Sequence, residues 1–153
     1  MPDKLGKLPH YSVQYTEDGS PTLYNEICGE SCHSKHGAIE ETKVDGLQGS
    51  KFIEFGEGPF DQSELVGFAR ETDMVYTQAS ATQRIITPDG IIEVGRENST
   101  SCVLWNPWID KSKRLSNFAD DEYHTMLCLE VANVLDDSAT VAPGHSHTLG
   151  TTI

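Results

Sequence analysis

The sequence predicts an all-β protein built as an antiparallel β-sandwich. From residue 39 onward, short segments rich in β-branched and aromatic residues recur, and turn signals separate them. The expected strands are residues 41–44, 52–55, 75–78, 83–87 and 91–94. The turn signals are Asp45-Gly46, Gly49-Ser50, residues 56–59 and Pro88-Asp89-Gly90. Short strands at this spacing are typical of an antiparallel sandwich.

Two later segments, residues 101–105 and 125–131, are the most apolar strands of the sequence and are expected to hold the core. Between them, residues 110–118 contain good helix formers and predict one short helical turn followed by a loop. A last strand is expected at residues 148–153, after the turn Ala142-Pro143-Gly144.

A chain of 153 residues is expected to form one domain. Residues 39–153 make up the sandwich portion. Residues 1–38 are an unassigned N-terminal segment, because they show no sustained period of 3.6 or 2. Within this segment, residues 11–15 and 22–27 are short strand candidates on either side of a turn at residues 18–21.

The charge of the chain is strongly acidic, with 11 Lys and Arg against 24 Asp and Glu and a formal net charge of -13. Such a chain repels nucleic acid and anionic lipid, so neither is an expected partner. No apolar run approaches the roughly 20 residues of a membrane helix, and Met1-Pro2-Asp3-Lys4 does not lead into a signal peptide. We therefore expect a cytoplasmic protein.

The cysteines are Cys28, Cys32, Cys102 and Cys128. Without a secretion signal they are expected to be reduced thiols. A zinc site from Cys28, Cys32, His33 and His36 is the alternative, but the second ligand pair follows the first without a separating finger. No metal is therefore expected.

The segment Trp105-Asn106-Pro107-Trp108 resembles the Trp-Asn-Pro-Trp segment of the hexose-6-phosphate mutarotases, also called glucose-6-phosphate 1-epimerases, which are aldose 1-epimerase-like enzymes. The likeness continues in order and spacing through residues 118–123, Met126-Leu127-Cys128-Leu129-Glu130, residues 142–144 and residues 146–149. Upstream, Glu71-Thr72-Asp73-Met74-Val75-Tyr76 is similar to the family's Glu-Val-Asp-Arg-Val-Tyr, and residues 43–49 are similar to its Val-Glu-Gly-Leu segment. Together these matches cover residues 39–153.

This resemblance implies the galactose-mutarotase-like β-supersandwich, with a sugar site on its open face. It also implies interconversion of α and β anomers at C1 of a hexose or hexose 6-phosphate, without a cofactor. A full family member is nearly twice as long, so the chain resembles a carboxyl-terminal half, truncated on the N-terminal side. Half a sandwich would expose sheet edges, and we therefore expect self-association through them.

Mutarotation needs a base that takes the proton of the anomeric hydroxyl and an acid that protonates the ring oxygen. Glu130 is the predicted base, because it ends the apolar run 126–129, where a carboxylate needs partners or a task. His33 is the predicted acid, because a two-residue deletion would align it with the family's histidine. The ungapped alignment places Ser31 there instead.

Three further residues are predicted to bind the sugar. Asp73 corresponds to an acidic residue that would accept bonds from sugar hydroxyls, although Met74 follows it where the family has arginine. Trp108, together with Trp105, offers an aromatic plane on which a pyranose could stack. On the alternative interpretation the tryptophans pack in the sandwich, which applies above all to Trp105 because it continues an apolar strand. Asn106 completes the set.

The dense basic cluster Lys111, Lys113 and Arg114 is the candidate for holding a phosphate, but a solvated helical face is the preferred interpretation. The leading hypothesis is thus an isomerase acting on the anomers of a hexose 6-phosphate. The alternative is a non-catalytic carbohydrate-binding or inactive fragment of the same fold. The short length, the displaced histidine and Met74 favour that alternative.

Overall fold

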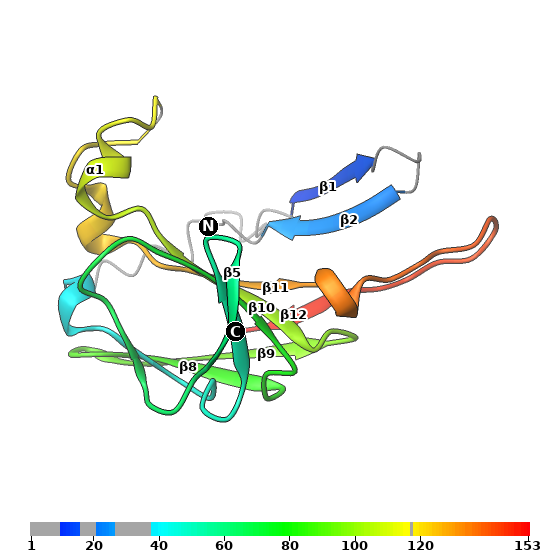
Figure 1. Cartoon of the computed structure of the whole chain (residues 1–153), viewed down its shortest axis with the longest axis horizontal. Coiled ribbons are helices and arrows are strands. Elements are labelled where there is room, and N and C mark those ends of the chain that lie inside the picture. The colour runs from blue at the N-terminus through cyan, green and yellow to red at the C-terminus, as the bar shows by residue number, and fades with distance from the viewer. Residues whose placement is uncertain (1–9, 16–20, 27–37, 117) are drawn as a thin grey trace, which may run out of the picture.

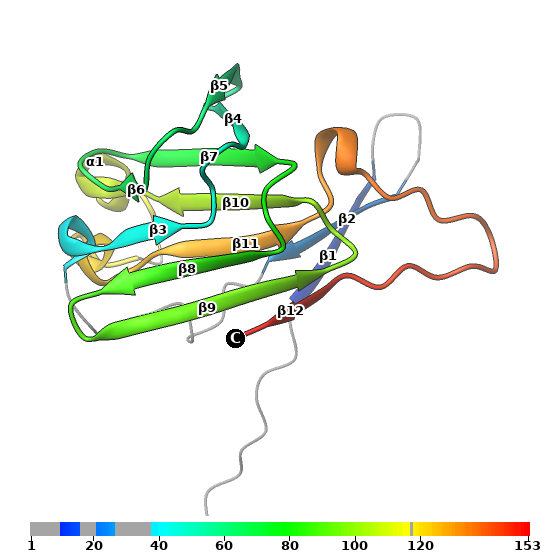
Figure 2. The ribbon, with the colours of Figure 1, turned by 90° about the horizontal axis from the view of Figure 1, so that it is seen from below.

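The structure, a computed structural model, describes residues 10–15, 21–26, 38–116 and 118–153. In these residues the chain forms two five-stranded antiparallel sheets, a separate two-stranded hairpin and a few short helical turns. Figures 1 and 2 show the two large sheets packed face to face. The predicted all-β sandwich is confirmed.

The first sheet, called sheet I, has the strand order β11-β10-β7-β4-β5. Its strands are β4 (Lys51–Glu54), β5 (Glu57–Asp61), β7 (Thr72–Thr77), β10 (Ser101–Asn106) and β11 (Cys128–Ala132). The second, called sheet II, has the order β12-β9-β8-β3-β6. Its strands are β3 (Lys43–Asp45), β6 (Val66–Gly67), β8 (Thr82–Thr87), β9 (Gly90–Glu97) and β12 (Gly150–Thr152).

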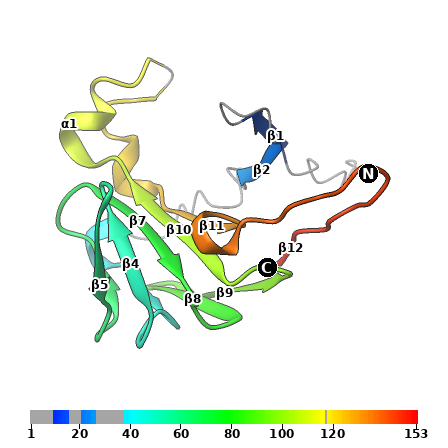
Figure 3. The same cartoon turned by 45° about the vertical axis from the view of Figure 1, so that its right-hand side comes forward.

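Outside the two sheets, β1 (His10–Tyr15) and β2 (Pro21–Glu26) pair as an antiparallel hairpin. In the described residues the helical elements are α1 (Trp108–Ser112) and three single turns: η2 (Ile39–Glu41), η3 (Glu122–Thr125) and η4 (Leu135–Asp137). Strand β2 lies against β11, and Figures 1 and 3 place the hairpin on the side of β11 that faces away from β8 and β9. No helix in the described part of the chain is long and apolar enough to cross a membrane.

Each strand of sheet I has two faces because side chains alternate along a strand. In β7, Thr72, Met74 and Tyr76 are buried, while the residues between them are half-buried. The cross-strand pairs Met74–Leu104 and Leu104–Leu129 extend the buried set to β10 and β11. We call this side, which packs on sheet II, the core face, and the opposite side the outer face.

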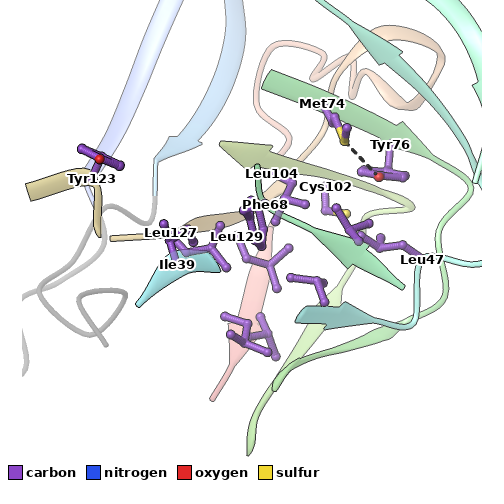
Figure 4. Packing of buried hydrophobic residues seen from close by; sticks show 14 residues of the cluster. Ile39, Leu47, Phe68, Met74, Tyr76, Cys102, Leu104, Tyr123, Leu127 and Leu129 are labelled. Carbon is purple, nitrogen blue, oxygen red and sulfur yellow. Dashed lines mark hydrogen bonds between the residues drawn. The ribbon is translucent and has the colours of Figure 1, made fainter. Parts of the chain in front are cut away.

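The core lies between the two sheets. Figure 4 shows Leu104, Leu129, Phe68, Cys102 and Leu47 packed together there. Sheet II contributes Val44, Val66, Ile85 and Val94 to the core. The hydroxyl of Tyr76, a side chain with no exposed surface, donates to Gln62 Oε1 at 2.9 Å and lies 3.2 Å from Met74 Sδ. The buried phenol therefore keeps a polar partner inside an apolar layer.

Most predicted strands are confirmed within a few residues, but residues 56–59 are not simply a turn. Residues 57–61 form β5, which pairs with β4 at one edge of sheet I. Pro59 lacks an N–H group, and an edge strand tolerates this because one of its sides has no partner strand. Self-association through such edges stays a prediction.

The start of β11 also differs from the prediction. The sequence predicts a strand from residue 125, but β11 begins at Cys128, and residues 122–125 form a helical turn. The side-chain amide of Asn106 donates to the carbonyl oxygens of Tyr123, at 2.9 Å, and Met126, at 2.6 Å. These bonds hold the segment off the sheet until residue 128.

A network of polar side chains joins several chain segments at the end of β11. The Asp137 carboxylate accepts a bond from the Thr100 backbone N–H at 2.8 Å and one from Asn133 Nδ2 at 3.2 Å. Asn133 Oδ1 lies 2.8 Å from His147 Nε2, which ties the segment before β12 to the same point. Partial burial raises the pKa of Asp137, but these hydrogen bonds outweigh it and hold that pKa below its ordinary value of 3.8.

We predict that Asp137→Asn destabilises the protein in a pH-dependent manner. A carboxyl whose pKa is lower in the folded state stabilises the fold above its unfolded pKa, and this contribution is lost as pH falls through the folded pKa. The deficit in free energy of unfolding should therefore be full at neutral pH and shrink below roughly pH 4. Urea denaturation at several pH values measures it, with exposed Asp136→Asn as the matched control. A deficit that does not change with pH would contradict the assignment.

Leu104→Ala tests the core. Leu104 has no exposed surface and lies on a central strand, so the truncation should lower the free energy of unfolding by about 2–5 kcal/mol. Ile91→Ala is the control, because Ile91 is 64% exposed and its truncation should cost little. Urea denaturation of both variants checks the prediction, and equal effects would show that the core is not centred on β10.

Candidate functional site

Glu130 lies on the outer face of sheet I. It is the half-buried residue of β11, whose other residues, Cys128, Leu129, Val131 and Ala132, are buried. Its cross-strand partner on β10 is Val103, which pairs in turn with Val75. The carboxylate thus stands beside β-branched side chains on a sheet surface that is neither fully buried nor fully exposed.

Asp73 and Trp105 lie on the same outer face, one row along. Trp105 pairs with Asp73 on one side and with Cys128 on the other. Since residues two apart on a strand share a face, Glu130 lies next to Cys128 on this face. The structure therefore brings Glu130, Asp73 and Trp105 together on three adjacent strands.

An apolar row adjoins these groups. Ile53, Val75 and Val103 are cross-strand neighbours on β4, β7 and β10, and the row ends at Glu130 on β11. All of these side chains are half-buried. Figure 1 shows α1 and the β1–β2 hairpin on this side of the sheet, away from β8 and β9. The outer face thus combines an apolar surface with two carboxylates and an indole.

Asn106 lies beneath the site rather than on it. Its side chain has no exposed surface, and besides its two donor bonds its Oδ1 accepts the backbone N–H of Trp108 at 2.9 Å. These three bonds join the end of β10, the start of α1 and the segment before β11. The amide therefore positions the chain around the outer face.

Trp108 is separated from Trp105 by a sharp reversal of the chain. Trp108 has a positive φ of 55°, a backbone conformation that bulky residues rarely adopt. Its ring packs on Tyr123, with centroids 5.3 Å apart, and lies against the core cluster. Trp105, and not Trp108, lies on the face that carries Glu130 and Asp73. The alternative interpretation of the sequence instead packs Trp105 inside the sandwich.

Met74 lies on the opposite face from Asp73. It is 8% exposed and pairs with Leu104 in the core. Methionine in place of the family's arginine therefore changes the core face of β7. The outer face keeps the carboxylate of Asp73.

Sequence reasoning missed an ion pair at this end of the outer face. Lys111 Nζ lies 2.9 Å from Glu71 Oε1, and both side chains are about one-third exposed, at 32% and 30%. The same ammonium lies 5.7 Å from the centroid of the Trp105 ring. Lys113 and Arg114 are exposed. Lys111 is thus distinguished from the rest of the basic cluster by its partners, which no sequence pattern reveals.

The other predicted groups fall partly outside the described residues. His33 lies there, as do Cys28, Cys32 and His36 of the alternative zinc site. Within the described ranges, no group of three or more His, Cys, Asp or Glu side chains is placed to hold a metal. Cys102 and Cys128 are buried, and burial raises the pKa of Cys102 to about 11, so this thiol stays protonated at neutral pH.

Comparison with known proteins identifies relatives of similar sequence. A relative from Cenchrus ciliaris named "Putative glucose-6-phosphate 1-epimerase" is 33% identical over 111 residues, which cover 69% of this chain and 33% of the relative. A protein of the same name from Haemophilus influenzae is 26% identical over 100 residues, covering 64% of this chain and 36% of that protein. The chain thus spans about a third of the length of these curated relatives.

The fold is shared with a solved structure. The crystal structure of HI1317 matches with a TM-score of 0.56 and 19% sequence identity, over 84% of this chain and 58% of that one. The family model described as aldose 1-epimerase matches residues 29–153. The resemblance found in the sequence is confirmed, and the chain belongs to the aldose 1-epimerase family.

Proposed function

We propose that the chain is an isomerase that interconverts the α and β anomers of a hexose 6-phosphate, with Glu130 as the base. One observation carries the proposal: Glu130 shares the outer face of sheet I with Asp73, Trp105 and an apolar row. A sugar presents both hydroxyl groups and an apolar ring face, and this surface offers partners for both. Family membership supports the reaction class.

In the proposed reaction, the Glu130 carboxylate takes the proton from the hydroxyl at C1. The C1 oxygen becomes a carbonyl oxygen while the bond between C1 and the ring oxygen breaks, and an acid protonates the ring oxygen. Rotation about the C1–C2 bond followed by reclosure gives the other anomer. The two protons return in the reverse steps, so no cofactor takes part.

We propose His33 as the acid. A histidine suits this role because its pKa lies near neutrality. The proposal is supported by the family match, which begins at residue 29 and so includes position 33. His33→Asn should lower the rate of anomer exchange, and His36→Asn is its matched control.

Asp73 is proposed to accept bonds from sugar hydroxyls. Its position directly across from Trp105 places a carboxylate beside the indole. We propose that Asn106 and Trp108 support the residues that contact the sugar and do not contact it themselves. Asn106 is buried under the site, and Trp108 packs on Tyr123.

A second candidate function is sugar binding without catalysis. The observation that favours it is the length of the chain, which spans about a third of its curated relatives. The two candidates differ in whether the protein accelerates anomer exchange.

We predict that the protein accelerates the approach of α-glucose 6-phosphate to its anomeric equilibrium and that Glu130→Gln lowers this rate by about 100-fold or more. The amide keeps the shape of the side chain but cannot take the proton. NMR of the anomeric proton, or polarimetry, measures the rate.

Glu57→Gln is the matched control for Glu130→Gln. Glu57 is exposed on β5, at the opposite edge of the same sheet. The Glu57→Gln variant should therefore exchange anomers at the rate of the unaltered protein. Full activity in Glu130→Gln would rule out Glu130 as the base. A protein that binds the sugar but leaves the spontaneous rate unchanged would favour the second candidate function.

Asn106→Ala should act through stability. The change leaves the carbonyls of Tyr123 and Met126 and the N–H of Trp108 without this partner, and it should lower the free energy of unfolding by about 2–4 kcal/mol. The control is Gln48→Ala, because the Gln48 side chain is exposed and its amide bonds only to residues of its own turn. Urea denaturation measures both. If Asn106→Ala weakens sugar binding at unchanged stability, Asn106 contacts the sugar directly.

A further inference from the structure

We infer that Trp105 is the surface on which the sugar ring stacks, and that the Glu71–Lys111 ion pair holds its indole in position. This inference rests on the proposed function, because it names how the same site holds its substrate. The sequence motif contains two tryptophans, and the structure separates their roles.

Trp105 lies between the two carboxylates of the outer face. Directly opposite cross-strand residues have Cβ atoms roughly 5 Å apart, and diagonal ones roughly 7–8 Å. Asp73 is directly opposite Trp105, and Glu130 is its diagonal neighbour on β11. A ring lying on the indole would therefore have one carboxylate beside it on each flanking strand, the arrangement that proton removal and hydroxyl binding need.

The two indoles differ in their surroundings. Trp108 packs on Tyr123, with the two ring planes tilted by 54°, and against the core cluster. Trp105 points to the outer face and is half-buried, next to the apolar row that ends at Glu130. An indole face attracts the apolar face of a pyranose, whose C–H bonds carry a partial positive charge.

An ion pair lies against the indole. Glu71 directly precedes β7, and its carboxylate pairs with the Lys111 ammonium that lies over the outer-face residue Trp105. Lys111 extends from α1, and its ammonium lies 2.9 Å from Glu71 and 5.7 Å from the centre of the Trp105 ring. The pair thus spans from α1 to β7 with its ammonium over the indole, a cation–π contact that restricts the orientation of the ring.

Helix α1 is itself fixed. Asn106 Oδ1 accepts the first N–H of α1, and Ser112 Oγ donates to the Trp108 carbonyl. Because its position is set by α1 and its charge is shared with Glu71, Lys111 is a positioning residue and not the group that recognises a phosphate.

Tryptophan fluorescence tests the role of Trp105, because the chain has two tryptophans. Trp108→Phe leaves Trp105 as the fluorophore, and Trp105→Phe leaves Trp108. The probe is 1,5-anhydroglucitol 6-phosphate, which lacks the anomeric hydroxyl and cannot open. It should change the emission of Trp108→Phe in a saturable manner and leave that of Trp105→Phe unchanged. The reverse pattern, or no change in either variant where calorimetry shows binding to the unaltered protein, would overturn the inference.

Trp105→Leu provides a second readout that does not depend on the folding of the Trp108 variant. Loss of the indole should weaken binding of the same probe about tenfold by calorimetry, since stacking of this size contributes near 1.4 kcal/mol. Ile109→Leu is a control, because Ile109 is 39% exposed on α1. Unchanged affinity in Trp105→Leu would contradict the stacking role.

Lys111→Met tests the positioning role. It should weaken binding of 1,5-anhydroglucitol and of its 6-phosphate by the same factor, about threefold, and Lys111→Arg should restore both. Glu71→Gln should act in the same direction. A loss confined to the phosphorylated sugar would show that Lys111 binds phosphate, and no loss with either sugar would show that the ion pair does not position Trp105.

The two proposals fail separately. A protein in which Trp105 reports sugar binding but anomer exchange is not accelerated keeps this inference and loses the proposed enzyme activity. A protein whose activity depends on Glu130 while Trp105 stays silent keeps the function and loses this inference.

Discussion

The central strands β7 and β10 direct every second side chain into the core, and this alternation fixes what the outer face of sheet I can carry. Met74, Tyr76, Cys102 and Leu104 fill the space between the sheets. The residues between them must point the other way. Asp73, Val75, Val103 and Trp105 therefore share one surface. A shift of one residue in either register would exchange the two faces and remove the site.

The end of β10 is the second constraint. Asn106 uses both ends of its amide to hold the chain as it leaves the sheet, and Trp108 takes a left-handed backbone conformation directly afterwards. This reversal sends Trp108 toward Tyr123 and lets Lys111 return over Trp105. The Trp-Asn-Pro-Trp motif thus contains the outer-face indole of Trp105, the buried amide of Asn106 that hydrogen-bonds to the backbone, and the indole of Trp108 that packs on Tyr123.

Much of the fold could be predicted from the sequence, because β-branched runs and turn residues mark most strands directly. Strand β6 could not be found, since two residues carry no pattern. The late start of β11 could not be found either, because it depends on a side chain some 20 residues away, Asn106. For the site, Glu130 and Asp73 could be identified from the sequence motifs. That they lie on one face of one sheet depends on the strand order and register, which the motifs do not give. The pairing of Lys111 with Glu71 depends on where α1 lies, which periodicity does not specify.

The central claim is that the outer face of sheet I receives the sugar. NMR chemical-shift mapping tests it most directly, with 1,5-anhydroglucitol 6-phosphate added to the isotopically labelled chain. The account predicts that the largest shifts fall on β7, β10 and β11, at Asp73, the Trp105 indole and Glu130, while β8 and β9 stay unchanged. Shifts centred on sheet II, with the Trp105 indole unaffected, would contradict it.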